Sequence, residues 1–220
     1  MRTPRMADDE SLASLSLEEL AGRLASAEPV PGGGSAAALA GVLGAALVSM
    51  VVELTHRSGS QPEEDRVALS HIGEGARARL AELLELADRD SRAYAAVMRA
   101  RRLPRSTNEQ RATRGQAISQ ATADATRVPL QTARAAAAVV DLAARVAPIG
   151  NPSAASDAGV AALLSTAAMR AAALNVRINL PFLAPEAALV REAPRELVAL
   201  DAQVSAGEAR TLAAVAERMG

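Results

Sequence analysis

Apolar residues recur at helical spacing along nearly the whole chain, and no useful length alternates between apolar and polar positions as a half-buried strand does. Prolines and clusters of Gly, Ser and Asn divide this pattern into separate segments. The expected helices are 16–28, 35–55, 61–102, 107–146, 158–180 and the remainder after Pro185, with a kink at Pro129 and a break at Pro194. The pattern predicts an all-α fold, a helical bundle of about six to seven helices.

We expect residues 11–220 to form a single domain and residues 1–10 to be a disordered leader. Three helices have a start signal in which a serine precedes a glutamate by three residues, a spacing typical of a capping box. These pairs are Ser16 with Glu19, Ser60 with Glu63, and Ser106 with Glu109.

The helix expected over 35–55 is rich in small residues. Ser35 is placed to cap it by accepting from the free amides of the first turn. Gly41 and Gly44 lie inside the helix and lower its stability unless another backbone comes close. We therefore expect these glycines to mark the contact of a tight helix pair.

Residues 36–52 contain no charged side chain and almost reach the length that spans a bilayer. Alanine and glycine dominate this stretch, and Glu53 ends it at once. The segment therefore favours a buried core helix, and no membrane partner is expected.

Composition narrows the possible functions. Tyr94 and Phe182 are the only aromatic residues among 220, so the core must consist of Ala, Leu and Val. The formal net charge is −1 and there is no lysine, so neither a basic field nor aromatic stacking platforms indicate nucleic acid. The absence of cysteine and the presence of two histidines argue against a metal site and fit a cytoplasmic location.

Two glycine- or serine-rich loops, PVPGGGS and IGNPSAASD, lead into expected helices. Helix N-termini carry unpaired amides and a partial positive charge, and glycine lets a ligand approach the backbone closely. Both loops are therefore candidate walls of one pocket, and an ordinary connection with a helix cap is the alternative interpretation of each. The candidate residues are Gly32, Gly33, Gly34, Ser35 and Asn151.

The middle helix carries a candidate acid. Asp90 and Tyr94 are four residues apart and share a helix face, and Asp90 is flanked by apolar residues at helical spacings. A carboxylate on a buried face needs either a structural partner or a chemical role, and both interpretations stay open. Asp88 points away from Asp90, and we expect it to form a solvated ion pair with Arg92.

A later helix carries two amides. Asn175 and Asn179 are four residues apart on one face of an otherwise apolar helix, so neighbours or a ligand must satisfy them. Structural pairing is the default interpretation.

Four segments of the chain, taken in order, resemble the cyclodeaminase/cyclohydrolase family of folate enzymes. They are PVPGGGSAAALAGVLGAALVSMVVELT, LADRDSRAYAAVMRARRLPRST, VPLQTA and GNPSAASDAGVAALLSTAAMRAAALNVRINL. The resemblance implies an all-helical homodimer, a tetrahydrofolate substrate and no cofactor beyond that substrate. The principal reading is a formiminotetrahydrofolate cyclodeaminase, which forms 5,10-methenyltetrahydrofolate and releases ammonia. The alternatives are a methenyltetrahydrofolate cyclohydrolase and a non-catalytic helical module that binds folate or a protein partner.

The resemblance also suggests roles for residues. Asp90 is the expected acid/base group, since either reaction requires proton transfer at a carbon between two nitrogens, and Asp157 is the second choice. Asn175 and Asn179 are expected to hold the pterin or the reacting amidine. The remaining expected substrate-binding residues are Gly32, Gly33, Gly34, Ser35, Tyr94 and Asn151.

One departure from the family pattern stands out. After the Leu-Thr that ends the glycine-led helix, the family continues with a glycine and one or more basic residues, often beside a tyrosine. Here Thr55 is followed by HRSGSQPEED, and only Arg57 can replace the basic group. This altered turn, His56 to Asp65, is the feature that favours the non-catalytic module.

Overall fold

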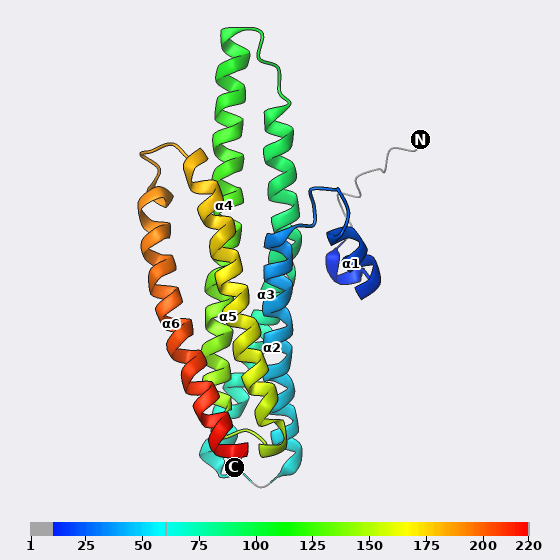
Figure 1. Cartoon of the computed structure of the whole chain (residues 1–220), viewed down its shortest axis with the longest axis vertical. Helices are drawn as coiled ribbons and strands as arrows, with labels where there is room; N and C mark the ends of the chain where they lie inside the picture. Colours follow the sequence, from blue (N-terminus) through cyan, green and yellow to red (C-terminus); the bar gives the residue numbers. More distant parts are fainter. Residues whose placement is uncertain (1–10, 60, 220) are drawn as a thin grey trace.

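Residues 11–59 and 61–219 are described by a computed structural model, shown in Figure 1. This part of the chain contains no β-strand, so the all-α prediction is confirmed. The leader predicted at 1–10 lies outside the described residues. The α-helices are α1 (Leu17–Leu24), α2 (Gly33–Ser58), α3 (Glu63–Arg101), α4 (Asn108–Val146), α5 (Ala155–Asn179) and α6 (Ala188–Met219). Three short 3-10 turns are η1 (Leu12–Ser14), η2 (Pro152–Ala154) and η3 (Leu180–Phe182).

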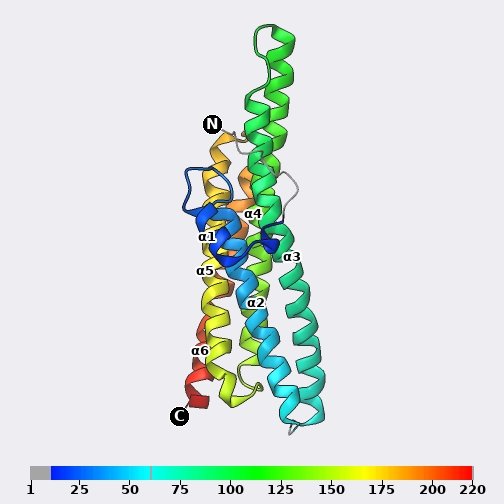
Figure 2. The same ribbon diagram turned by 90° about the vertical axis from the view of Figure 1, so that its right-hand side faces the viewer.

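Helices α2 to α6 pack side by side as one elongated bundle (Figure 1). The central helix is α4, which contacts α2, α3, α5 and α6. Helices α3 and α4 are the longest, and they continue together past the ends of α2 and α5 as a projecting hairpin (Figures 1 and 2). The short helix α1 lies outside the bundle (Figure 1).

The helix starts confirm one expected cap and correct a second, and the third lies outside the described residues. Ser16 and Glu19 form the predicted capping box of α1. Helix α4 begins one residue later than predicted, because Thr107 and not Ser106 accepts from the Gln110 amide and completes the box. The N-cap of α3 is Pro62, and the predicted cap Ser60 lies outside the described residues.

The prediction that Ser35 caps α2 is wrong. The helix begins two residues earlier, with Gly32 at the N-cap and no side-chain cap. Ser35 lies in the first turn with 0% of its surface exposed, and its hydroxyl donates to the Ala87 carbonyl of α3. The glycine triplet therefore belongs to the helix start rather than to a preceding turn.

The break predicted at Pro194 is also wrong, because α6 runs unbroken through it. The residues around this proline, Ala193 and Leu197, are buried in the core shared with α4 and α5. Packing on both sides of the proline outweighs the one backbone hydrogen bond that it removes. Helix α4 likewise continues through Pro129.

Small residues bring α2 and α5 close together in the core. A Cβ added at Gly44 would lie 2.1 Å from Ser165 Oγ and 3.0 Å from the Ala161 carbonyl oxygen. A Cβ added at Gly41 would lie 3.1 Å from Leu83 of α3. The predicted role of these glycines as contact points is confirmed, and only a residue without a side chain fits at Gly44.

Two segments, Gly33–Ser58 and Pro152–Phe182, are long and apolar enough to cross a membrane by length and composition. In these segments 50% and 56% of the most apolar stretch is buried inside the bundle. Core helices of soluble proteins pass the same test, so this property is weak support for a membrane location.

Candidate active site

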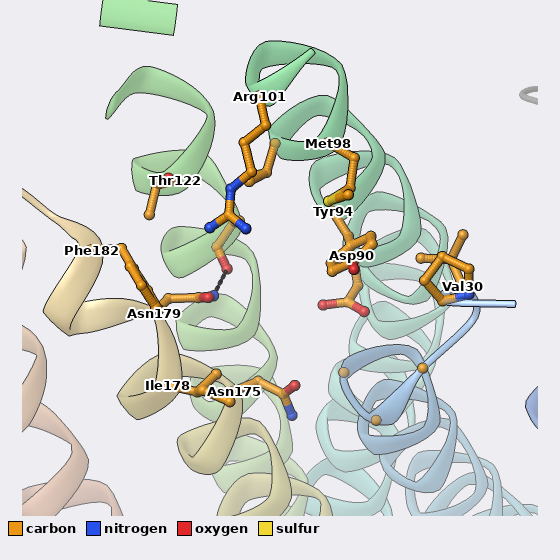
Figure 3. Close-up of a pocket in the computed structure, with 16 residues that line it drawn as sticks. Val30, Asp90, Tyr94, Met98, Arg101, Thr122, Asn175, Ile178, Asn179 and Phe182 are labelled. Atoms are coloured by element: carbon orange, nitrogen blue, oxygen red, sulfur yellow. Dashed lines mark hydrogen bonds between the residues drawn. The ribbon is translucent and has the colours of Figure 1, made fainter. Parts of the chain in front are cut away.

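A pocket of about 390 Å³ lies where α2 begins, α5 ends, and α3 and α4 pass between them (Figure 3). Its volume is within the range of small-molecule sites. Residues from segments far apart in the sequence meet on its wall. Seven of the site residues expected from the sequence line this pocket. They are Gly32, Gly33, Gly34, Asp90, Tyr94, Asn175 and Asn179.

The start of α2 approaches the Asp90 carboxylate directly. A Cβ added at Gly34 would lie 2.1 Å from Asp90 Oδ1, so no other residue fits there without displacing the acid. Because no side chain caps this helix, the amides at its start have no capping partner, and the Ser35 amide instead bonds to the Asp90 carboxylate. These amides and the helix dipole make this wall favourable for oxygen acceptors and negative charge.

Ser35 positions Asp90 from behind the pocket wall. Its Oγ lies 3.2 Å from Asp90 Oδ2, 2.9 Å from the Ala87 carbonyl oxygen and 3.1 Å from Ser91 Oγ. A single hydroxyl proton cannot serve all three neighbours, so its direction can follow the protonation of Asp90. Ser35 is not on the lining of the pocket, and its contacts are those of a positioning residue.

Burial raises the pKa of Asp90, because taking a carboxylate out of water disfavours its charged form. Hydrogen bonds from the side chain and backbone of Ser35 oppose this shift and lower the pKa in part. A carboxyl group with a raised pKa, open to a pocket, is a candidate proton-transfer group.

Each of the two asparagines on α5 donates a hydrogen bond from its side-chain nitrogen to a backbone carbonyl. Asn175 Nδ2 donates to the Ala171 carbonyl of its own helix at 3.0 Å, and Asn179 Nδ2 donates to Ala125 of α4 at 2.8 Å. Within the described part of the chain, neither side-chain oxygen has a hydrogen-bond partner. In each residue the side-chain nitrogen is therefore structurally paired, while the side-chain oxygen is left as a free acceptor.

Both aromatic residues of the chain lie at this pocket rather than in the core. Tyr94 is 42% exposed and Phe182 is 60% exposed, although large aromatic side chains normally contribute strongly to a core. The Arg101 guanidinium lies 5.8 Å from the centroid of the Phe182 ring. Figure 3 shows Arg101 directed toward Phe182 and Asn179.

Several pocket residues were not predicted. Val97, Met98 and Arg101 follow Asp90 and Tyr94 at helical spacings, so the periodicity of α3 was a usable signal for them. Other wall residues carried no such signal, and they are Pro29, Val30, Thr122, Ala125, Ile178 and Phe182. Among these, the Thr122 hydroxyl is buried and has no partner among the described residues, which leaves it available to a ligand.

Asn151 and Asp157 do not lie at this pocket. Asn151 lines a different pocket with Gly150 and Arg218, and its Oδ1 accepts from the Ser153 amide. Asp157 is in the first turn of α5, 18 residues before Asn175 and therefore about 27 Å from it along the helix. The prediction that both loops wall one pocket is wrong within one chain, because α2 and α5 start at opposite ends of the bundle (Figure 1).

The ion pair predicted between Asp88 and Arg92 is also not found. Asp88 instead accepts two hydrogen bonds of 2.7 Å, one from the Ser11 hydroxyl and one from the Leu12 amide. It therefore attaches η1 to α3. The asymmetry between Asp88 and Asp90 arises because they point to different faces of one helix.

The altered turn, His56 to Asp65, lies at the far end of α2. Arg57 is exposed there, 23 residues beyond Gly34 and therefore about 35 Å from the Asp90 pocket. Within one chain, the departure from the family pattern removes nothing from that pocket.

The described residues define an all-helical protein with an acid pocket at the start of its glycine-led helix. The sequence pattern of the formiminotransferase-cyclodeaminase family matches residues 16–198, and the chain belongs to this family. It is 44% identical over 185 residues to the methenyltetrahydrofolate cyclohydrolase of Methylorubrum extorquens, covering 83% of this chain and 87% of that protein.

Two further comparisons support the family. The chain is 34% identical over 177 residues to the formimidoyltransferase-cyclodeaminase of Mus musculus, but it spans only 32% of that longer protein. The crystal structure of the formiminotetrahydrofolate cyclodeaminase of Thermotoga maritima superposes with a TM-score of 0.83 at 26% identity, covering 96% of this chain and 100% of that one.

These comparisons change the order of the two activities. The sequence analysis put the cyclodeaminase first and the cyclohydrolase second. The relative with 44% identity carries the cyclohydrolase name, whereas the cyclodeaminases match at 34% identity or lower. The alternative is therefore supported better than the principal reading.

Proposed function

We propose that this chain is a methenyltetrahydrofolate cyclohydrolase, which adds water to the methenyl carbon and forms 10-formyltetrahydrofolate. The 44% identity to a protein of that name, over most of both chains, supports this choice. The observation that carries the proposal is the composition of the pocket. Both aromatic rings of the chain line this pocket together with the partly buried Asp90 carboxylate, a combination that suits a flat heterocycle carrying a reacting cation.

In this mechanism Asp90 is the base. The methenyl group is a cationic amidinium, so its approach stabilises the ionised form of Asp90 and offsets the effect of burial. Asp90 accepts a proton from water as the water oxygen bonds to the methenyl carbon. The resulting tetrahedral carbon then loses its bond to N5, N5 takes the proton from Asp90, and the hydroxyl proton leaves as the formyl group forms.

The other wall residues bind and orient the substrate. The unpartnered side-chain oxygens of Asn175 and Asn179 accept hydrogen bonds from N–H groups of the pterin. Tyr94 and Phe182 supply apolar surface for the flat rings. The free amides at the start of α2 bind carbonyl or anionic oxygens of the substrate.

The test is to incubate the purified protein with each candidate folate and follow the near-ultraviolet absorption band of the methenyl compound. The proposal predicts faster loss of this band from methenyltetrahydrofolate than in buffer alone. Growth of the band from the formimino compound, without that loss, instead supports the cyclodeaminase, which the structural match to the Thermotoga maritima enzyme favours. No change in either direction supports the non-catalytic module.

The variant Asp90→Asn connects this activity with the pocket. We expect kcat to fall by about 10²–10⁴-fold, the usual contribution of a positioned acid or base. The melting temperature at neutral pH should rise, because burial disfavours the ionised carboxylate of the wild type. The matched control is Glu85→Gln, an exposed carboxylate on the same helix, which should change neither quantity. Near-normal turnover by Asp90→Asn contradicts the assignment.

The same proposal includes a homodimer. Helices α2 and α5 are adjacent, and their outer faces carry apolar residues at helical spacing. The large exposed members are Leu43 and Met50 of α2 and Val160, Leu163, Leu174 and Ile178 of α5. An apolar face of this kind is typical of a protein interface, and a second copy of the same face is its natural partner.

A further inference from the structure

The carboxylate of Asp88 anchors the part of the described chain that precedes α2. This part, residues 11–31, is called the N-terminal arm below. Asp88 Oδ2 accepts from the Ser11 hydroxyl and Asp88 Oδ1 accepts from the Leu12 amide, each at 2.7 Å. Leu12 itself is 7% exposed and packs in the core of the bundle. The first two residues of the arm are therefore held by a polar and an apolar contact together.

The rest of the N-terminal arm has little contact with the bundle. None of residues 13–28 is buried, and only Leu15 and Leu20 pack partly buried against the core. Among the described residues, 25–31 form no hydrogen bond to the bundle. Helix α1 lies between the two ends of the arm and outside the bundle (Figure 1). The arm is therefore held mainly at its ends, by Asp88 at one end and by its entry into α2 at the other.

The second end of the N-terminal arm is a wall of the acid pocket. Pro29 and Val30 line this pocket, and Figure 3 shows Val30 beside Asp90, on the side away from Asn179. Every other described residue of the wall belongs to a helix of the bundle, to the cap of α2 or to η3. The packing of the bundle fixes those residues, whereas the position of Pro29 and Val30 depends on how the arm is held.

We propose that Asp88 is a positioning residue, which holds the N-terminal arm so that Pro29 and Val30 close the acid pocket against the bound substrate. This inference rests on the proposed function for the identity of that substrate. Asp88 and Asp90 are two residues apart on α3 and point to different faces, so one helix carries both the acid and the anchor of the wall beside it. A segment with few buried contacts opens readily, and without the anchor the arm moves away from the pocket.

Steady-state hydrolysis of methenyltetrahydrofolate tests this role. Asp88→Ala removes both acceptors, and we expect KM to rise by about tenfold, because the substrate loses part of its apolar wall. The value of kcat should change by less than about twofold, because this wall contacts the substrate before and during the reaction alike. Leu12→Ala weakens the same anchor without a change of charge, and it should also raise KM at nearly constant kcat. A fall in kcat at unchanged KM in both variants overturns the inference.

The conservative variant Asp88→Asn separates the anchor from the charge. Its side-chain oxygen can accept from the Leu12 amide and its nitrogen can donate to the Ser11 hydroxyl, so it should recover most of the KM lost in Asp88→Ala. An equal rise of KM in Asp88→Asn and Asp88→Ala shows that the charge acts directly on the cationic substrate, and it overturns the inference. The matched control is Glu85→Ala, an exposed carboxylate on the same helix, which should change neither constant.

The position of the N-terminal arm can be measured without turnover. The chain has no cysteine, so Glu28→Cys/Glu85→Cys takes one nitroxide spin label at the pocket end of the arm and one on α3, both at exposed positions. In labelled protein diluted with unlabelled protein, double electron–electron resonance should give a narrow distance distribution that stays narrow with Asp88→Asn and broadens with Asp88→Ala.

An equally narrow distribution in Asp88→Ala overturns the inference while leaving the cyclohydrolase proposal intact. Absence of turnover by the wild type overturns the proposed function instead. The distance distributions then decide whether Asp88 holds the arm at the pocket, because they require no substrate.

Discussion

Gly34 and Asp90 explain why a glycine triplet precedes a helix made of good helix formers. Asp90 projects from α3 toward the first turn of α2, and the space between them is smaller than a methyl group. Glycine there lowers the helix propensity, but it lets the backbone approach the carboxylate. The stability lost at the helix start is the cost of placing an acid beside free amide groups.

The variant Gly34→Ala tests this close approach. Its Cβ would lie 2.1 Å from Asp90 Oδ1, so either the acid or the helix start must move. We expect kcat/KM for the folate substrate to fall by about 10²-fold or more, since small displacements of a catalytic group have effects of that size. The far-ultraviolet circular dichroism should remain helical.

Gly22→Ala is the matched control, because a Cβ there meets nothing within 4 Å in α1. It should leave kcat/KM unchanged. Equal activity of Gly34→Ala and wild type contradicts the placement of Asp90 at the reacting group.

The contacts of Ser35 predict a pH effect. Its hydrogen bonds lower the pKa of Asp90 against the opposing effect of burial, so Ser35→Ala should raise that pKa further. A base works only when ionised, and the acidic limb of the kcat/KM profile should therefore move to higher pH. Ser35→Thr keeps the hydroxyl and should return the acidic limb most of the way to its wild-type position. A limb that stays in place, or moves to lower pH, contradicts the role of Ser35.

At this scale the sequence predicted what lies on one helix face and missed what depends on a distant neighbour. The shared face of Asp90 and Tyr94 follows from helical periodicity alone. The partners of Asp88, Ser11 and Leu12, are 77 and 76 residues away, and nothing local indicates them. Thr122 of α4 was missed for the same reason, because the other residues of the pocket are distant from it in the sequence.

At the scale of elements, the helices were predictable and their relative directions were not. Caps, prolines and apolar periodicity indicate where helices lie, with errors of a few residues at their ends. Two glycine-rich loops before two apolar helices suggested one shared pocket. The antiparallel packing of α2 and α5 separates those loops, so only the first one meets Asp90 within a chain.

The contact of α2 with α5 gives a prediction for stability. A Cβ at Gly44 would clash with Ser165 Oγ and with the Ala161 carbonyl, which belongs to the helix backbone. We expect Gly44→Ala to lower the free energy of unfolding by at least about 1–3 kcal/mol, the usual effect of overpacking. Urea unfolding followed by circular dichroism measures this loss.

Ser165→Ala provides the comparison. The Ser165 hydroxyl is buried and has no hydrogen-bond partner among the described residues, so its removal should leave stability unchanged or raise it. The double variant should recover part of the loss caused by Gly44→Ala, because the backbone contact remains. A fully additive result contradicts a direct clash between these two residues.

At the scale of the whole molecule, one apolar surface is left uncovered. Residues 36–52 of α2 contain no charged side chain, which is why the sequence raised a membrane span and then a core helix for this segment. On α5, Arg170 and Arg177 are exposed beside the apolar residues. The inner faces of α2 and α5 are buried in the bundle, so the core-helix interpretation of residues 36–52 describes half of α2. The other half is the surface assigned above to a second copy of the chain.

Leu43 lies near the middle of that face and is 58% exposed. If two copies associate through it, Leu43→Arg places an unpaired charge in the interface and should weaken the dimer by at least about 100-fold, a few kcal/mol. The matched control is Val198→Arg on α6, which is 69% exposed on a different helix and should stay dimeric. Size-exclusion chromatography with light scattering, at several protein concentrations, distinguishes the two. A monomeric wild type contradicts the proposed homodimer, and a dimer that is kept in Leu43→Arg places the interface elsewhere.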